Sequence, residues 1–397
     1  MAVYPASRVR EKGPNINKTE DVCMKKELIC RVAVVMTLIT LTAAAEEPSV
    51  YDKIWGVTNY ENKEAPVLQK LAFVGRLQGD AYSFGEDSKH NEDFTWRRLR
   101  LGFKAEFFQD WLIHIEGDFD LNEIENWDAF NNRLTDSYIG WSPSQKVKLK
   151  VGKQSAGFTL DGATSSKKLI VPERSIVAGN LWFGTEYFTG ATIFGDVDSV
   201  YYKAGAYSSS AESGFGHFES GYFTLLSGGI KLGDQSSMRL DYVFNDTDYD
   251  SNYEYGTSKL EHIVALVYKT QLNEKLGLWA DIAGGIGNSD ENMSDLIGID
   301  IMPFYNFSES LQLVLQYAGV TSLEGDADVN MARYASRNAN RNQVETAHNL
   351  LLGFNWYLYG HKLKWQNAVE YNYGENLNGS GEDYNGYGLT SALRVSW

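Results

Sequence analysis

The sequence predicts an all-β protein: a transmembrane antiparallel β-barrel of about 16 strands, with the third long loop folded into the lumen. Three observations lead to this prediction. Apolar and polar side chains alternate with a period of two over most of residues 68–397, as in strands with one apolar face. Along the chain, short and long connections between these strands alternate. A short apolar segment with a basic start precedes them and is typical of exported proteins.

The two-residue period defines the predicted strands. In one segment Leu99, Leu101 and Phe103 share a face, while Arg98 and Arg100 share the other. The predicted strands cover residues 68–82, 93–109, 111–122, 133–142, 146–154, 186–195, 198–208, 219–232, 236–246, 258–272, 274–287, 294–307, 309–320, 346–359, 361–374 and 384–397. Alternation alone is also compatible with a soluble β-domain, in which the apolar faces would be buried against each other.

The connections distinguish these two architectures. The long connections are Gly85–Asn91, Glu123–Asn132, Ser155–Thr185, Ser209–Phe218, Thr247–Thr257, Asn288–Met293, Thr321–Glu345 and Glu375–Asp383. A short turn follows or precedes each of them, as in outer-membrane barrels, where short turns face the periplasm and long loops face outside. Aromatic residues near strand ends, such as Phe108, Trp111 and Trp356, resemble the girdles of such barrels. A closed barrel also pairs every strand N–H and C=O, as lipid requires.

Residues 1–67 precede the predicted barrel. A basic start after Met24, an apolar core and small residues up to Ala45 predict a signal peptide that is cleaved after Ala45. Residues 1–23 are polar and unpatterned, so we interpret them as an upstream extension. A buried core helix is the alternative for the apolar run, which is short for a transmembrane helix. We expect residues 46–67 to form a periplasmic segment with a short helix or an ordered tail.

Cysteine content and charge exclude several classes of protein. Cleavage would remove Cys23 and Cys30 and leave no cysteine for a disulfide, a thiolate metal site or a nucleophile. The whole chain has a formal net charge of −16; residues 1–45 hold seven Lys/Arg and four Asp/Glu, so the remaining chain carries −19. A nucleic-acid-binding protein would have a basic footprint instead.

The segment Ser155–Thr185 is the longest interval without alternation. Loops of this length are usually functional or disordered. Its apolar residues, including Phe158, Leu160 and Ile176, argue against disorder. We therefore expect this segment to fold inward, pack inside the barrel and narrow the pore.

The segments around this loop resemble the phosphate-selective porin O and P family. The resemblance rests on Trp96-Arg97-Arg98-Leu99-Arg100 within residues 94–103, and on residues 110–111, 116–120, 136–141, 149–154 and 165–175. The terminal Trp397 resembles the aromatic end of many outer-membrane barrels. The resemblance implies a sixteen-stranded, usually trimeric barrel in the outer membrane of a Gram-negative-type bacterium, with a basic constriction. It implies passive diffusion of small hydrophilic solutes without catalysis or a cofactor, and an anion or phosphate preference is the accompanying hypothesis.

Nine cations are candidate pore or anion-binding residues. They are Arg97, Arg98, Arg100, Lys104, Lys148, Lys150, Lys167, Lys168 and Arg174. The family implies roles for the paired arginines and for the three loop cations, and the others fall by parity on lumen-facing strand positions. Like charges in a narrow channel enrich counter-ions and speed their entry. Alternatively, the strand cations neutralise acids such as Glu116 and Asp118 on neighbouring strands, and the loop cations form an exposed surface cluster.

Other features carry weaker signals. Arg97 falls on the apolar face by parity, so it either reaches the membrane interface or is turned into the lumen by a bulge. The lumen faces carry more acids, and the loop fewer arginines, than the family leads one to expect. No metal-ligand spacing or catalytic motif is present; Asp326, Asp328 and Asn330 have a calcium-like spacing without the downstream Gly and Glu. An enzyme embedded in the outer membrane and an adhesive or structural barrel without an open channel are the alternative functions.

Overall fold

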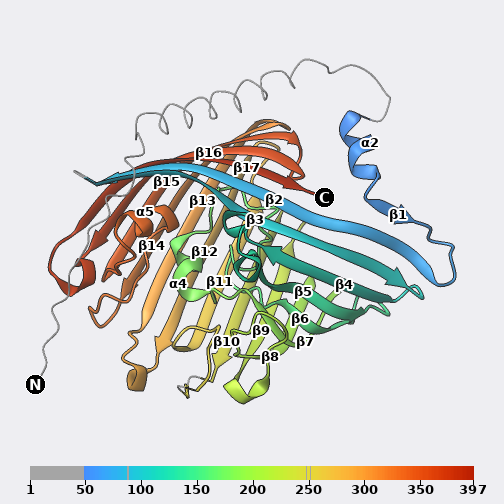
Figure 1. The fold of residues 1–397 in the computed structure, drawn as a ribbon, viewed down its shortest axis with the longest axis horizontal. Coiled ribbons are helices and arrows are strands. Elements are labelled where there is room, and N and C mark those ends of the chain that lie inside the picture. The colour runs from blue at the N-terminus through green and yellow to red at the C-terminus, as the bar shows by residue number, and fades with distance from the viewer. Residues whose placement is uncertain (1–48, 87–88, 247, 251) are drawn as a thin grey trace, which may run out of the picture. The chain divides into compact units, whose positions relative to one another are not determined.

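The computed structural model describes residues 49–86, 89–246, 248–250 and 252–397. The predicted upstream extension and signal peptide, residues 1–45, lie outside the described residues. By its contacts the chain divides into a unit Met1–Asp52 and a unit Lys53–Trp397. The second unit holds the whole barrel (Figure 1). No helix within the described residues is long and apolar enough to cross a membrane.

Sixteen strands, β2 to β17, form a closed ring in which each strand is antiparallel to its neighbours and β17 pairs with β2. This confirms the predicted barrel. The strands are β2 (Leu68–Glu86), β3 (Lys89–Phe107), β4 (Trp111–Phe119), β5 (Asn131–Trp141), β6 (Lys148–Ser155), β7 (Tyr187–Val197), β8 (Val200–Ser208), β9 (Tyr222–Leu232), β10 (Ser236–Asn245), β11 (Leu260–Gln271), β12 (Leu276–Gly287), β13 (Leu296–Ser308), β14 (Leu311–Ser322), β15 (Thr346–Tyr359), β16 (Leu363–Glu375) and β17 (Tyr384–Ser396).

Short elements accompany the ring. They are the strand β1 (Asn59–Glu61), the helices α2 (Val50–Gly56), α3 (Trp127–Phe130), α4 (Ile176–Leu181) and α5 (Arg333–Asn338), and the 3-10 turns η1 (Leu121–Glu123), η2 (Phe218–Ser220), η3 (Ser289–Glu291) and η4 (Leu377–Gly379). Figure 1 shows α4 and α5 enclosed by the ring of strands. Both helices therefore come from connections that enter the barrel.

The two faces of the strands are those of a barrel in lipid. Phe103 and Ile115 are 57% and 55% exposed, although Arg100 and Glu116 on the opposite faces of the same strands are each 1% exposed. Other exposed outward residues are Ile139, Val151, Leu226, Leu240, Val264, Ile282, Leu315, Leu352, Val369 and Leu389. A soluble β-domain would bury such residues and expose the charged face. The distribution therefore favours the membrane barrel over the soluble alternative.

One predicted long connection is wrong. The interval Gly85–Asn91 belongs mostly to a continuous hairpin, because β2 and β3 remain paired as far as Glu86 opposite Lys89. Backbone pairing continues there without an apolar face, since a hairpin that extends beyond the membrane needs none. The residues here are mostly polar or small, so the alternation of apolar and polar side chains did not reveal that the two strands extend this far. The other seven long connections are present between the strands expected to flank them.

The segment before the barrel contains both a helix and ordered extended chain. Residues 59–61 of β1 pair with residues 70–72 of β2, at a level where β17 has already ended. The indole Nε1 of Trp55 donates to the carbonyl of Ser396 at 2.6 Å, and its ring centroid lies 5.2 Å from that of Tyr359. The segment thus covers the seam at which the first and last barrel strands meet.

Replacing Trp55 with Ala should weaken this seam. The change removes one hydrogen bond and one aromatic contact, which together contribute about 1–2 kcal/mol. We expect the folded barrel to convert to the slow-migrating unfolded form at a lower temperature in gel mobility measurements. Exposed Trp127 in α3 provides the matched control, and an equal loss of stability in Trp127→Ala would contradict a specific role for Trp55.

Candidate functional site: the constriction inside the barrel

Residues 156–186, between β6 and β7, cross the lumen and are bound to the opposite wall. The backbone N–H of Thr159 donates to Asp241 of β10 at 3.0 Å, and that of Leu160 donates to Asp281 of β12 at 2.7 Å. The carbonyl of Ile170 accepts from Asn355 of β15 at 2.6 Å. These partners project inward from strands far around the ring, so the loop lies inside the barrel, as expected.

The loop is packed rather than loose. Its helix α4 begins after Ser175, whose hydroxyl caps the backbone N–H of Ala178. Phe158, Leu181 and Phe183 are almost completely buried and belong to a core that includes Phe223 of the barrel wall. Side chains that fill an interior in this way hold the backbone in one position. The loop therefore forms a fixed constriction.

Four arginines surround one carboxylate where the loop rejoins the wall. Glu186 lies 3.1 Å from Arg100 and 3.2 Å from Arg174, and more distantly 3.7 Å from Arg133 and 3.8 Å from Arg98. Asp118 of β4 is the second acid of this group and lies 3.2 Å from Arg100 and 3.6 Å from Arg133. Six buried or half-buried charged groups thus meet, with more positive than negative charge. We call these six residues the Glu186 cluster.

Some hydrogen-bond donors of the Glu186 cluster have no partner among the described residues. The guanidinium of Arg98 donates through Nη1 to Gln78 at 3.0 Å, but its buried Nε and Nη2 have no hydrogen-bond partner among the described residues. Buried donors of this kind normally bond to water or to an ion. The arrangement can therefore accept an oxyanion or a halide more readily than a cation.

A β-bulge brings Arg97 into the lumen together with Arg98. The register pairs Gln78 with Arg98 and Gly79 with Trp96, which leaves Arg97 without a partner in β2. Its guanidinium binds Glu173 of the loop through two hydrogen bonds. Burial alone would raise the pKa of the Glu173 carboxyl, but the charges of Arg97, Arg333 and Arg98 hold it well below its usual range. Of the two possibilities for Arg97, the bulge is the one observed.

The other predicted strand cations are more dispersed. Lys150 lies over the rings of Tyr138 and Phe194, at 4.7 and 5.3 Å from their centroids. Lys148 lies near the periplasmic turns, 3.9 Å from Asp196. Lys104 is half-buried on β3 and forms no ion pair among the described residues. These three lysines are separate from the Glu186 cluster, whereas Arg98 and Arg100 belong to it.

The three predicted loop cations have different environments. Arg174 donates to Glu186 and to the carbonyl of Asp161, at 3.2 and 2.9 Å. Lys167 donates to the backbone oxygen of Trp397 at 3.2 Å, and burial lowers the pKa of its ammonium to about 8. Lys168 is exposed. Arg174 thus joins the cluster, while the two lysines lie at the periplasmic side of the loop.

Sequence reasoning missed several lumen residues. Glu186 was assigned to the start of a strand, but it turns the chain at φ 66° between loop and wall. Arg133 was not singled out, although it contacts both acids of the cluster. Two further lumen arginines form buried ion pairs, Arg76 with Glu116 and Arg394 with Asp80. The sequence could have indicated Arg76 and Arg394, because the two-residue alternation places both on the lumen-facing side of their strands.

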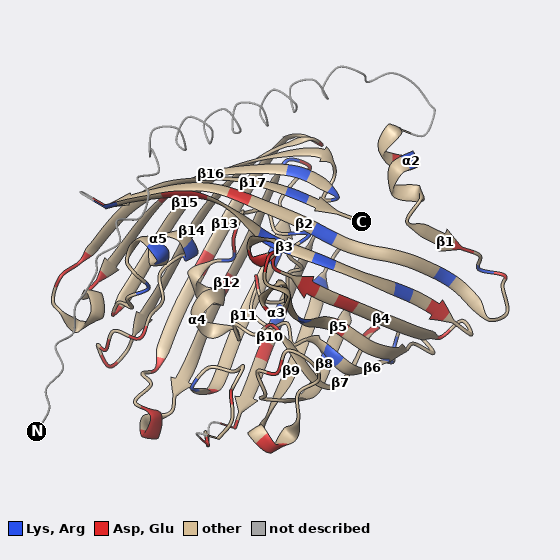
Figure 2. Ribbon diagram, viewed as in Figure 1, with Lys and Arg blue, Asp and Glu red and all other residues tan. Residues whose placement is uncertain are grey.

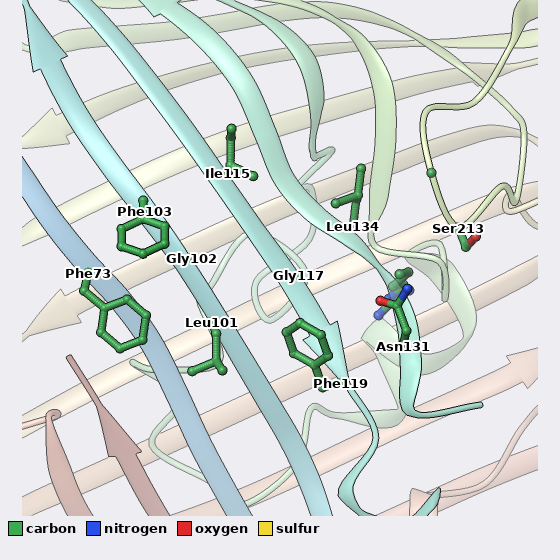
Figure 3. Close-up of a pocket in the computed structure, with 12 residues that line it drawn as sticks. Phe73, Leu101, Gly102, Phe103, Ile115, Gly117, Phe119, Asn131, Leu134 and Ser213 are labelled. Carbon is green, nitrogen blue, oxygen red and sulfur yellow. The ribbon is translucent and has the colours of Figure 1, made fainter. Parts of the chain in front are cut away.

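A groove on the outer face of the barrel lies outside the constriction. It has a volume of about 570 Å³ and is lined by outward side chains such as Phe73, Phe103 and Ile115, together with Ser213 (Figure 3). Here β5 is not paired with β6 along its full length, and the backbone N–H of Leu134 donates to Ser213 at 2.8 Å instead. The connection after β8 thus covers the part of the wall that the inward loop leaves open. Because this groove faces the lipid, it is not a path for solutes.

The calcium-like spacing in residues 326–330 serves a structural purpose. Asp326 and Asp328 accept hydrogen bonds from Ser294 at 3.3 and 3.0 Å, and the backbone N–H of Asn330 donates to Asn180 at 2.7 Å. Within the described residues, no group of three or more His, Cys, Asp or Glu side chains could hold a metal ion.

Comparison with known families shows what the barrel is similar to. The model of the family described as phosphate-selective porin O and P matches residues 72–252. The predicted resemblance to this family is confirmed over these residues. A comparison with curated protein sequences gives no match. The family match, together with the outer-membrane porins among the similar solved structures, indicates the outer membrane of a Gram-negative bacterium.

Solved structures confirm the porin fold over most of the chain. The anion-selective porin from Comamonas acidovorans has 10% identity and a TM-score of 0.57, with 82% of this chain and 99% of that chain covered. OprB of Pseudomonas putida has 13% identity and a TM-score of 0.58, covering 82% and 94%. The trimer form of OmpT of Vibrio cholerae has 13% identity and a TM-score of 0.54, covering 82% and 99%. Fold and family point to a channel rather than an enzyme.

Proposed function

We propose that this porin allows small hydrophilic solutes to diffuse through the barrel without chemical change and prefers anions. The observation that carries the preference is the Glu186 cluster, in which four arginines meet two acids. In a confined channel with low-dielectric walls, an excess of fixed positive charge concentrates anions. The family name and the anion-selective neighbour are consistent with this proposal.

An acidic region on the opposite wall limits the proposed preference. Asp241, Asp281 and Asp300 are buried there, accompanied by Arg239 and Lys269. The carboxylates of Asp241 and Asp281 are occupied by the backbone of the loop. They therefore hold the constriction in place, and the solute passes on the basic side of the loop.

We further propose a homotrimer embedded in outer-membrane lipid. The exposed apolar band supports contact with lipid acyl chains. The support for the trimer is the OmpT structure, which has the same fold and is a trimer. A catalytic or adhesive barrel has no comparable support.

Neutralising the three loop cations tests the preference. We expect Lys167→Gln, Lys168→Gln and Arg174→Gln together to lower the anion-to-cation permeability ratio by roughly tenfold, because three positive charges leave a confined channel. The reversal potential in a salt gradient across a planar bilayer measures this ratio. The two lysine changes alone provide a comparison in which the Glu186 cluster is intact. An unchanged reversal potential in the triple variant would contradict a role for these residues in selectivity.

A further inference from the structure

The connection between β14 and β15, residues 323–345, is a second loop that folds into the barrel. The hydroxyl of Tyr334 in α5 donates to the buried carboxylate of Asp80 on β2 at 2.5 Å. Asn338 at the other end of α5 donates to the hydroxyl of Tyr384 at 3.3 Å. Both wall residues project inward, so α5 is fastened to the lumen side of the seam between β2 and β17. The sequence had suggested only an external loop here.

The second loop is also fastened to the first. Asn180 of α4 donates through Nδ2 to the carbonyl of Asn330 at 3.0 Å and accepts through Oδ1 from the backbone N–H of Asn330 at 2.7 Å. Val329 and Met331 belong to the same apolar core as the buried side chains of α4. The two loops therefore form one packed unit, and the space left for a solute lies beside both of them.

Arg333 is the charged residue of α5 that the packing leaves accessible. Tyr334, Ala335 and Asn338 are buried and hold the helix to the wall, whereas Arg333 is exposed. It forms no hydrogen bond or ion pair with any described residue. Its charge nevertheless acts on Glu173 and Arg97 of the constriction. Figure 2 shows the basic colouring of α5 inside the ring of strands.

Arg337 on the same helix differs from Arg333, because the guanidinium of Arg337 contacts other side chains of the protein. Its guanidinium lies over the rings of Tyr82 and Tyr334, at 5.7 and 5.5 Å from their centroids, and donates to the hydroxyl of Tyr82 at 3.3 Å. These aromatic contacts hold Arg337 against the wall. Arg333 is thus the guanidinium of α5 whose donors can meet a passing solute.

We propose that residues 323–345 are a second constriction element and that Arg333 selects anions on the external side of the first. This inference rests on the proposed porin function. A guanidinium presents paired N–H groups that match carboxylate and phosphate oxygens. The ligand class is therefore a small oxyanion or carboxylate, held briefly by Arg333 before it meets Arg98 and the rest of the Glu186 cluster.

The test compares Arg333→Gln with the wild-type protein in planar bilayers. We expect the variant to lower the anion-to-cation permeability ratio by roughly two- to fivefold, because one charge is lost from the channel. Arg333→Lys keeps the charge and should retain most of the ratio for chloride, but should weaken the reduction of chloride current by added inorganic phosphate. Lys89→Gln, at the exposed tip of the first hairpin, is the matched control and should leave both quantities unchanged.

The outcomes separate the inference from the function on which it rests. A conducting wild type with an unchanged ratio in Arg333→Gln would overturn the role of Arg333 and leave the porin function intact. An equal loss in Lys89→Gln would show that the effect is not specific to the lumen and would also overturn it. No current from the wild type would overturn both the function and the inference.

Discussion

Glu186→Gln should be the most damaging single change in the constriction. It removes the carboxylate on which Arg98, Arg100, Arg133 and Arg174 converge and leaves Asp118 as the remaining acid of the cluster. Removing one partner from a buried group of charges typically costs about 3–5 kcal/mol, because the opposite charges stay buried without compensation. We expect a marked fall in the temperature at which the barrel unfolds, followed by gel mobility after heating.

The same variant should change selectivity in the opposite direction from the loss of arginines. The molecules that fold gain net positive charge at the constriction, so the reversal potential should move toward a stronger anion preference. Glu186→Asp keeps the charge and should restore much of both stability and selectivity. Glu125→Gln removes the same charge from an exposed loop and should change neither. Wild-type stability in Glu186→Gln would show that the arginines are neutralised by other groups.

Releasing the loop from the opposite wall should widen the pore. Asp241→Ala combined with Asp281→Ala removes the acceptors of the Thr159 and Leu160 N–H groups. Each buried donor left without a partner costs about 1–3 kcal/mol. We expect the loop to leave this wall, conductance to rise and larger neutral sugars to enter proteoliposomes in swelling measurements.

A matched pair of variants separates this widening from simple charge loss. Asp241→Asn with Asp281→Asn removes the same charges but keeps an amide oxygen that can accept from each N–H. It should retain the wild-type size limit for neutral sugars. If the asparagine and alanine variants admit the same sugars, the carboxylates do not act by holding the loop.

The strands were predictable because lipid and water impose a local pattern on each of them. Alternation around Leu99, Leu101 and Phe103 is visible in a single segment, and the closed ring confirms it. The pattern failed at Gly85–Asn91, where β2 and β3 extend beyond the part that needs an apolar face. The inward course of the loop between β6 and β7 was also predictable, because the loop is long and its many apolar side chains had to be buried.

The charge cluster was not predictable as a unit, because its members come from distant segments. Arg98 and Arg100 were identified on β3, but Arg133 and Glu186 become their neighbours only when the ring closes and the loop turns back to the wall. No spacing between residues in the sequence predicts that these four side chains will be neighbours. In the second inward loop the apolar Val329, Met331 and Val344 were the overlooked signal, and they are buried in the lumen core.

Net charge is a poor guide to the charge of the pore. Acidic residues gather in the long connections, as the red segments at the loop ends in Figure 2 show. Among them are Glu123, Glu125, Asp290, Glu291 and Glu382. Salt screens exposed charges over about 8–10 Å, whereas the arginines around Glu186 act on a solute in a confined space. A chain with a net charge of −16 can therefore surround an anion-preferring constriction.

The reversal potential of the purified wild-type protein in a planar bilayer with a salt gradient tests the central claim most directly. The arginine-rich constriction predicts stepwise current increments and a zero-current potential with the sign of anion preference. Stepwise current with the opposite sign would contradict the assignment of selectivity to the Glu186 cluster. The absence of stepwise current would contradict an open pore.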